Sequence, residues 1–185
     1  MCRIISYNIH SGVGRDKKHD YRRIGNFLAE RDADIVLLQE MDTRPESRNV
    51  SQDIRDICAS NIYQLVASPA LTENYGWYGN AVLTRYPVIS NETLDVSQSG
   101  FQPRNIQTVV LETPKGPLTV VNTHKGLKKQ ERRSQFGLLH EYIAPFRQSC
   151  RMALQNLFLP LHGKELVLVA LSSCFFYQCF HFTVF

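Results

Sequence analysis

The stretch ADIVLLQE, residues 33–40, carries four apolar side chains in a row and then ends on Gln39 and Glu40. A short apolar run of this kind is typical of a strand buried on both faces. The preceding residues 20–30 begin with Asp20, a favoured helix N-cap, and repeat apolar side chains at helical spacing. Residues 2–9, CRIISYNI, are rich in β-branched residues and stop at a glycine-containing turn. Strand, helix and strand in succession predict a crossover unit and an α/β fold.

The rest of the chain alternates in the same way. We expect a helix capped by Ser51 that carries Ile54, Ile57 and Cys58. The other predicted elements are strands over residues 63–67 and 80–85, an aromatic loop TENYGWYG over residues 72–79, a β-hairpin formed by residues 105–113 and 118–124 around the turn PKGP, and a helix over residues 128–143. No internal repeat or linker interrupts this order.

Composition indicates one ordinary globular domain. The 185 residues are 43% hydrophobic and 21% charged, which is enough for a sizeable core. A net charge of +4 permits a phosphate-bearing partner without requiring one. The five cysteines are scattered and form no C-x-x-C pair, so the sequence predicts neither a disulfide framework nor a zinc site. With a strand beginning at the N-terminus in place of a signal peptide, we expect a reducing, cytoplasmic location.

The composition changes after residue 150. Residues 151–185 carry only three charged side chains, and the last twenty residues contain no Asp, Glu, Lys or Arg. We therefore expect two parts, residues 1–150 as the main domain and residues 151–185 as a divergent apolar tail.

Polar side chains recur where the predicted strands end. These residues are Asn8, His10, Glu40, Asn80, Asn122 and His124. Side chains at the carboxyl ends of neighbouring strands converge on one rim of an open sheet, where ligands usually bind. A single carboxylate there suits Mg²⁺, which keeps several waters and takes one or two carboxylates from a protein. Nearby histidines and amides are suited to hold a phosphate oxygen or to move a proton.

Each of these residues also has a structural interpretation. A polar residue just past a strand is commonly a turn or cap residue. Glu40 alone is then a solvated loop residue, and His124 alone is a histidine bonded to a backbone carbonyl. The basic run KGLKKQERR, residues 125–133, is by default a solvated helix face, although its place directly after His124 also favours an anionic substrate.

Taken together, five motifs resemble a known family. SYNIH, ADIVLLQE, YGNAVLTRYP, LTVVNTHKG and ERRSQFGLL are similar, in order and spacing, to motifs of the endonuclease/exonuclease/phosphatase superfamily with the deoxyribonuclease-I-like fold. The resemblance covers about residues 3–145. It implies a four-layered α/β sandwich that is incomplete at its C-terminal end, and hydrolysis of a phosphoester with Mg²⁺, or alternatively Mn²⁺, as cofactor.

The resemblance also implies residue roles. Glu40 is the metal ligand, and Asn8 is its neighbour, which touches the metal through water or contacts the phosphate. His124 contacts the scissile phosphate or assists proton transfer. The substrate-binding set comprises Asn80, Arg104 and Asn122. The implied substrate is a phosphoester, in nucleic acid, a phospholipid headgroup or a small molecule, and no obligate protein partner is evident.

The second half of the family pattern is not matched. The family has a strand ending in Gly-Asp-x-Asn and later a Ser-Asp-His, whereas the nearest stretch here, LVLVALSSC, offers Ser172 and Ser173, and no Asp follows Asp95. A hydroxyl stays neutral near pH 7 and cannot replace a carboxylate as the base that orients a water. We therefore expect activity to be lost or severely reduced, and the alternative is an inactive fragment or a metal- or phosphate-binding module.

Two hypotheses address the apolar tail. In the first, the reading frame is disturbed near residue 150, so that an unrelated tail replaces the family sequence. In the second, the final twenty residues form a membrane anchor, since their length matches a bilayer span. Polar side chains such as Gln178 and His181 dilute the apolarity and favour the first hypothesis.

Overall fold

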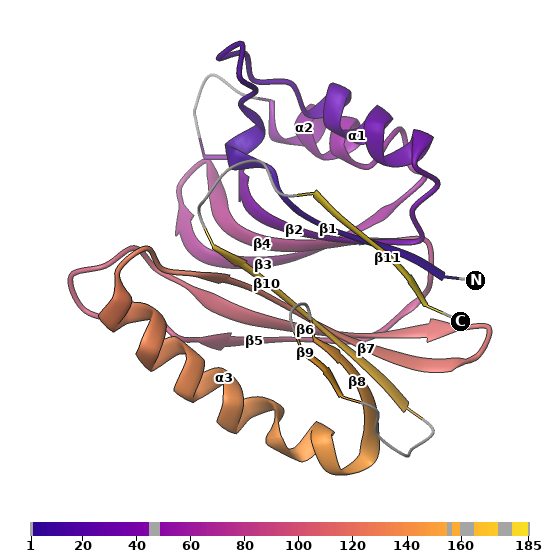
Figure 1. The fold of residues 1–185 in the computed structure, drawn as a ribbon. Coiled ribbons are helices and arrows are strands. Elements are labelled where there is room, and N and C mark those ends of the chain that lie inside the picture. Colours follow the sequence, from indigo (N-terminus) through magenta and orange to yellow (C-terminus); the bar gives the residue numbers. More distant parts are fainter. Residues whose placement is uncertain (1, 45–48, 155–156, 160–164, 174–178, 185) are drawn as a thin grey trace. The chain divides into compact units, whose positions relative to one another are not determined.

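A computed structural model describes residues 2–44, 49–154, 157–159, 165–173 and 179–184, with side chains over 2–44 and 49–145. The chain divides into two compact units, one formed by Met1–Arg85 with Phe175–Phe185 and the other by Tyr86–Cys174. The described residues contain two β-sheets and three α-helices, so the predicted α/β class is confirmed (Figure 1).

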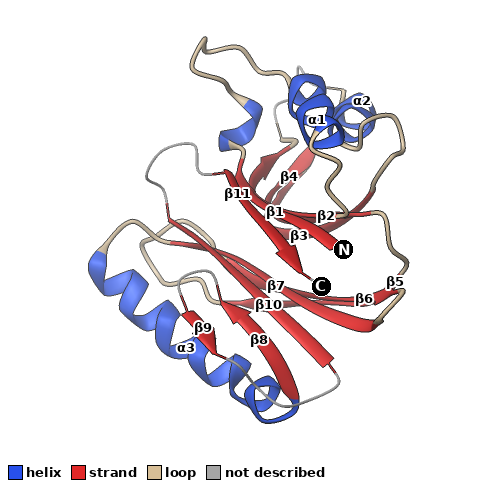
Figure 2. Ribbon diagram, turned by 45° about the vertical axis from the view of Figure 1, so that its right-hand side comes forward, coloured by secondary structure: helices blue, strands red, loops and turns tan. Residues whose placement is uncertain are grey.

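The first unit is a five-stranded sheet with two helices on one face (Figure 2). Its elements are β1 (Cys2–Asn8), a 3-10 turn η1 (His10–Gly12), α1 (Tyr21–Glu30), β2 (Ile35–Asp42), α2 (Val50–Ile57), β3 (Gln64–Glu73), β4 (Gly76–Thr84) and β11 (Cys179–Val184). The strand order is β11-β1-β2-β4-β3. β1 and β2 are parallel, as the crossover prediction requires, and the other pairs are antiparallel.

The helices of this unit pack on the sheet through one apolar core. Side chains from α1, β1 and β2, including Leu28, Ile5 and Leu38, are fully buried in it. Asp20 caps α1 as predicted, because its Oδ1 accepts a hydrogen bond of 2.8 Å from Arg23 N. Helix α1 lies so close to α2 that a Cβ on Gly25 would collide with the backbone carbonyl oxygen of Asp56.

Two details of the first unit differ from the prediction. The cap of α2 is Asn49 and not Ser51, because the Asn49 side chain accepts a hydrogen bond from Gln52 N. The aromatic stretch 72–79 is mostly strand, because β3 continues to Glu73 and β4 begins at Gly76. Aromatic side chains favour such cross-strand pairing, and they shorten the connection to a tight hairpin turn.

The second unit is a six-stranded sheet with one long helix (Figure 1). Its elements are β5 (Val88–Asp95), β6 (Asn105–Thr113), β7 (Gly116–Lys125), α3 (Lys129–Ser149), β8 (Cys150–Leu154), β9 (Leu157–Leu159) and β10 (Glu165–Ser173), with strand order β5-β6-β7-β10-β8-β9. The predicted hairpin of β6 and β7 is confirmed. Helix α3 is longer than predicted, and Tyr142 OH on it lies 2.9 Å from Thr108 Oγ1 on β6.

Strands also form in the tail of the chain. β10 lies parallel to β7, with Leu166 opposite Leu118 and Ser172 opposite His124, and β11 is antiparallel to β1. The described part of the proposed membrane anchor, residues 166–173 and 179–184, is therefore β-strand. Within the described ranges, none of the helices is both long and apolar enough to cross a bilayer. The division at residue 150, the frame hypothesis and the cytoplasmic location remain predictions.

Candidate functional site

Glu40 stands in a strained backbone position near the end of β2. The pairing of β2 with β4 shifts between Leu38 and Met41, so β2 carries an extra residue there and bulges. Glu40 adopts a φ of 59°, in the left-handed region that non-glycine residues rarely occupy. Its side chain is 10% exposed. The bulge therefore holds an acidic side chain, largely buried, at the carboxyl end of a parallel strand pair.

Asn8 and His10 contact both carboxylate oxygens of Glu40. Asn8 Nδ2 donates a hydrogen bond of 3.0 Å to Glu40 Oε1, and His10 Nδ1 lies 3.1 Å from Oε2. The other end of the Asn8 amide accepts a 3.0 Å hydrogen bond from the His10 backbone N–H. The two hydrogen bonds of the Asn8 side chain require the same orientation of its amide. Residues of the first unit therefore hold the Glu40 carboxylate in position.

A second acid on β2 is already engaged. Asp42 accepts hydrogen bonds from Arg44 Nε at 2.9 Å and Nη2 at 3.1 Å. The Asp42 carboxylate raises the pKa of Arg44, first through these hydrogen bonds and despite partial burial. Tyr21 OH bonds the Asp42 backbone, donating to its carbonyl oxygen and accepting from its N–H. Asp42 is thus a structural partner of Arg44, which leaves Glu40 as the acid suited to a cation.

Asn80 lies on β4 opposite the bulge. The register pairs Leu38 with Ala81 and Met41 with Gly79, so Asn80 falls between these two pairs. Its side chain is buried, with 2% exposure. The first unit therefore places the predicted residues Asn8, Glu40 and Asn80 on three adjacent strands.

Oxygen ligands at this position fit a hard divalent cation. Glu40 supplies one carboxylate, and Mg²⁺ commonly binds through one or two carboxylates while it retains water. No group of three or more His, Cys, Asp or Glu side chains with metal-binding geometry occurs among the described residues. The donor set thus suits a hydrated ion held at Glu40, and it does not form a closed all-protein cage.

The second unit brings Asn122 and His124 to one end of its sheet. They are two residues apart on β7, so both side chains lie on the same face, and both are buried. Asn122 Nδ2 lies 3.4 Å from Gln107 Oε1 on β6, and Gln107 Nε2 donates to Asn91 Oδ1 on β5. These side-chain amides form a row across β5, β6 and β7, and the row holds the Asn122 side chain in position.

Arg104 precedes β6 at the same end of the sheet. It is 4% exposed, and its guanidinium donates to Pro103 O and to Gln102 Oε1, both at 3.0 Å. Among the described residues, its Nε has no hydrogen-bond partner and no carboxylate forms an ion pair with it. Burying a cation without an acid is costly, so this guanidinium is suited to receive an anion.

The end of β7 is fastened to α3. Gly126 N donates a 2.8 Å hydrogen bond to Gln135 Oε1, and Gln135 Nε2 lies 3.3 Å from Glu131 Oε1. All three groups are buried, and a Cβ on Gly126 would collide with the Glu131 carboxylate. The sequence alone gives no signal for this clamp, because it depends on how the helix folds back onto the strand.

Asn8, Glu40, Asn122 and His124 lie at or near the carboxyl ends of their strands, whereas Arg104 directly precedes β6 and Asn80 lies in the middle of β4, opposite the bulge. Asn8, Glu40 and Asn80 belong to the first unit, whereas Arg104, Asn122 and His124 belong to the second. We predicted His10 as one of the strand-end residues, with only the general role of a histidine that holds a phosphate oxygen or moves a proton. Its contact with Glu40 follows from the turn η1. His10 has a φ of 52°, which local patterns do not reveal.

Comparison with known proteins defines the class. A family model described as the Endonuclease/Exonuclease/phosphatase family matches residues 5–163. The chain belongs to this family.

The chain is also similar to a curated protein sequence and, in fold, to solved structures. The chain is 25% identical over 153 residues to Uncharacterized protein YbhP of Escherichia coli K12. This alignment covers 76% of the chain and 60% of YbhP. It therefore spans less than two thirds of the length of this curated relative. An endonuclease/exonuclease/phosphatase from Beutenbergia cavernae is similar in structure, with a TM-score of 0.61, 19% identity, and coverage of 76% of this chain and 44% of that one. Humanized D. rerio TDP2 has a TM-score of 0.65 at 15% identity, with coverage of 92% and 65%. These structures support the deoxyribonuclease-I-like fold.

Proposed function

We propose that this protein is a Mg²⁺-dependent phosphoester hydrolase, in which Glu40 holds the metal. The observation that carries the proposal is the left-handed backbone of Glu40 in the β2 bulge. Such a conformation costs about 1–3 kcal/mol and persists where the surrounding structure and function require it. Together with family membership, this strain supports a functional carboxylate at that position.

In this proposal, Asn8 and His10 hold the Glu40 carboxylate in position. The Asn8 amide holds Oε1 in place, and His10, whose side chain is 68% exposed, meets Oε2 from the solvent side. When bound, Mg²⁺ or Mn²⁺ would polarise a phosphoryl oxygen and steady the leaving oxygen. Asn8 then acts by keeping the acid aimed at the ion, since its own oxygen is occupied by the His10 N–H.

The proposed phosphate contacts of the second unit come from Arg104 and His124, with Asn122 as a directed amide, and Asn80 is the proposed substrate-binding amide of the first unit. Arg104 supplies a buried positive charge that no described carboxylate neutralises. His124 is 3% exposed at the end of β7 and supplies a ring that can donate to a phosphate oxygen or transfer a proton. The proposed substrate is accordingly an anionic phosphoester.

A second candidate is a metal- and phosphate-binding protein without turnover. The parallel register of β10 with β7 favours it, because Ser172 is the residue opposite His124. The family pattern has an acid at the end of this strand, and the sequence contains no Asp after residue 95. Without a carboxylate to orient water, binding survives while hydrolysis is severely reduced.

Hydrolysis of bis(p-nitrophenyl) phosphate by the purified chain separates the two candidates. The hydrolase proposal expects Mg²⁺-dependent release of p-nitrophenol that disappears in Glu40→Gln and persists in Glu73→Gln, an acid of the same unit that is 53% exposed. Binding of Mg²⁺ without any release of product assigns the chain to the second candidate. Equal activity of wild type and Glu40→Gln contradicts the assignment of Glu40.

A further inference from the structure

A patch of exposed cations and apolar side chains lies where β7 passes into α3. We call it the β7–α3 surface, and it consists of Leu127, Lys128, Lys129, Arg133 and Phe136. Leu127 is 55% exposed and Phe136 is 45% exposed, which is high for large apolar side chains. The three cations are also exposed. The proposed catalytic contacts use none of these five side chains.

The cations of this surface have no acidic partner within the part of the chain that the structure describes. Among the described side chains, no carboxylate forms an ion pair with Lys128, Lys129 or Arg133. The one acid of the run, Glu131, is turned inward, where it is 3% exposed and meets Gln135. Cations at the start of a helix are also disfavoured by the helix dipole. These charges therefore add no stability to the helix, and they are open to an external anion.

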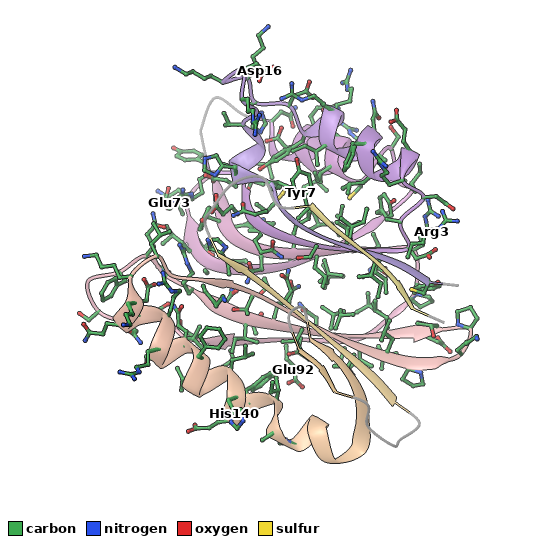
Figure 3. All side chains as sticks on the ribbon, in the orientation of Figure 1. Arg3, Tyr7, Asp16, Glu73, Glu92 and His140 are labelled. Carbon is green, nitrogen blue, oxygen red and sulfur yellow. The ribbon has the colours of Figure 1, made fainter. Side chains whose placement is uncertain are left out.

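Helical spacing gathers these groups on one side of α3. Lys129, Arg133 and Phe136 follow each other at intervals of four and three residues, and His140 continues the stripe. His140 points away from the sheet of its own unit (Figure 3), so the stripe faces outward. Leu127 and Lys128, which directly precede the helix, extend the stripe at its N-terminal end.

The apolar members distinguish between two kinds of polyanion. Bases of a single strand stack on open aromatic faces. Here Lys125 Nζ lies 4.4 Å from the centre of the Phe136 ring, and Lys128 Nζ lies 5.5 Å from that of Phe101, so one face of each ring is covered. Leu127, the more exposed apolar residue of the surface, cannot stack. Aliphatic and aromatic side chains among lysines and arginines instead suit the interface of an anionic bilayer.

We propose that the β7–α3 surface docks the protein on a membrane that contains anionic phospholipids. Lys128, Lys129 and Arg133 meet the headgroup phosphates, while Leu127 and Phe136 enter the boundary between headgroups and acyl chains. The proposal goes beyond the proposed hydrolase function and does not rest on it, because docking needs neither Glu40 nor a metal.

Vesicle co-sedimentation of the full chain tests the proposal. We expect binding to phosphatidylcholine vesicles that contain phosphatidylglycerol, weaker binding as salt is raised, and no binding to phosphatidylcholine alone. The double variant Lys129→Glu/Arg133→Glu should bind at least about tenfold more weakly, since each basic group near an anionic surface adds to the attraction. Leu127→Ser should also weaken binding, although it leaves the charge unchanged.

Matched controls keep the outcome specific. Lys17→Glu/Lys115→Glu makes the same change in net charge at exposed sites outside this surface and should bind like wild type. Equal binding to both vesicle types, or equal loss in both double variants, overturns the proposal. Binding of a single-stranded oligonucleotide that the Lys129→Glu/Arg133→Glu variant loses, with no binding of wild type to anionic vesicles, overturns it in favour of a nucleic-acid surface.

Discussion

The candidate residues of the two units carry opposite charges, and the partners that surround these charges differ. In the first unit, the acid Glu40 is surrounded by donors of its own unit, because Asn8 and His10 meet its two oxygens. In the second unit, the cation Arg104 is buried, and no described carboxylate pairs with it. In the proposed function, the first arrangement keeps a negative charge in place for a metal, and the second receives an anion. Single substitutions in the two units test this difference.

Asn8→Asp should have the largest effect. The new carboxylate would face Glu40 at the position of a 3.0 Å hydrogen bond, and two like charges in a buried contact should lower the free energy of unfolding by about 3 kcal/mol. Mg²⁺ should restore much of this loss, because two carboxylates suit the ion. Urea unfolding with and without Mg²⁺ measures both effects. Asn26→Asp, at an exposed position of α1, is the control, and an equal loss there would rule out repulsion by Glu40.

The helices of the two units differ in the space around one glycine of each, Gly25 in α1 and Gly137 in α3. Gly25→Ala should lower the free energy of unfolding by about 2 kcal/mol, because its Cβ meets the Asp56 carbonyl between α1 and α2. Gly137→Ala in α3 has open space and should stabilise by about 0.5–1 kcal/mol through helix propensity. Chemical denaturation of both variants checks the pair. Similar effects of the two changes would show that α1 and α2 are less closely packed than described.

Arg104→Met should change the free energy of unfolding by less than about 1 kcal/mol, because it removes a buried cation that no described carboxylate neutralises. Inorganic phosphate should raise the melting temperature of wild type and leave that of the variant unchanged. Thermal unfolding at increasing phosphate concentration measures this difference, with Arg55→Gln at an exposed site as the control. A loss of several kcal/mol without phosphate would instead make Arg104 a structural residue.

The smallest effect concerns Lys125 at the end of β7. Burial, and then the charge of Arg132, lower the pKa of Lys125 from its ordinary value of 10.5. The unfolded chain therefore binds more protons between the two pKa values, and stability rises with pH through that window. Arg132→Gln should raise the pKa of Lys125 and reduce this rise. NMR titration of the lysine side chain measures the change, and a constant pKa would leave burial as the whole cause.

The sequence predicted elements whose signals are local. Asp20 and the apolar spacing after it located α1, the run ending in Glu40 located β2, and the turn before Gly116 located the hairpin of β6 and β7. Strand β5 was missed because it is a mostly exposed edge strand, in which apolar and polar side chains need not alternate.

The arrangement of the candidate site required the structure. A pattern of residues places Glu40 at the end of a strand, but the bulge depends on pairing with β4, which is distant in the sequence. The contact of His10 with Glu40 likewise depends on a turn with positive φ after β1. The engagement of Asp42 by Arg44 could not be inferred from their spacing, so the sequence could not show which acid of β2 is available to a cation.

Calorimetric titration of the full chain with Mg²⁺ tests the central claim most directly. The account predicts binding to wild type and to Glu73→Gln, and affinity lowered by at least about tenfold in Glu40→Gln, because the amide removes the charge that a hard cation requires. Unchanged Mg²⁺ affinity in Glu40→Gln would contradict this prediction, since the carboxylate of Glu40 would then have no part in binding the metal.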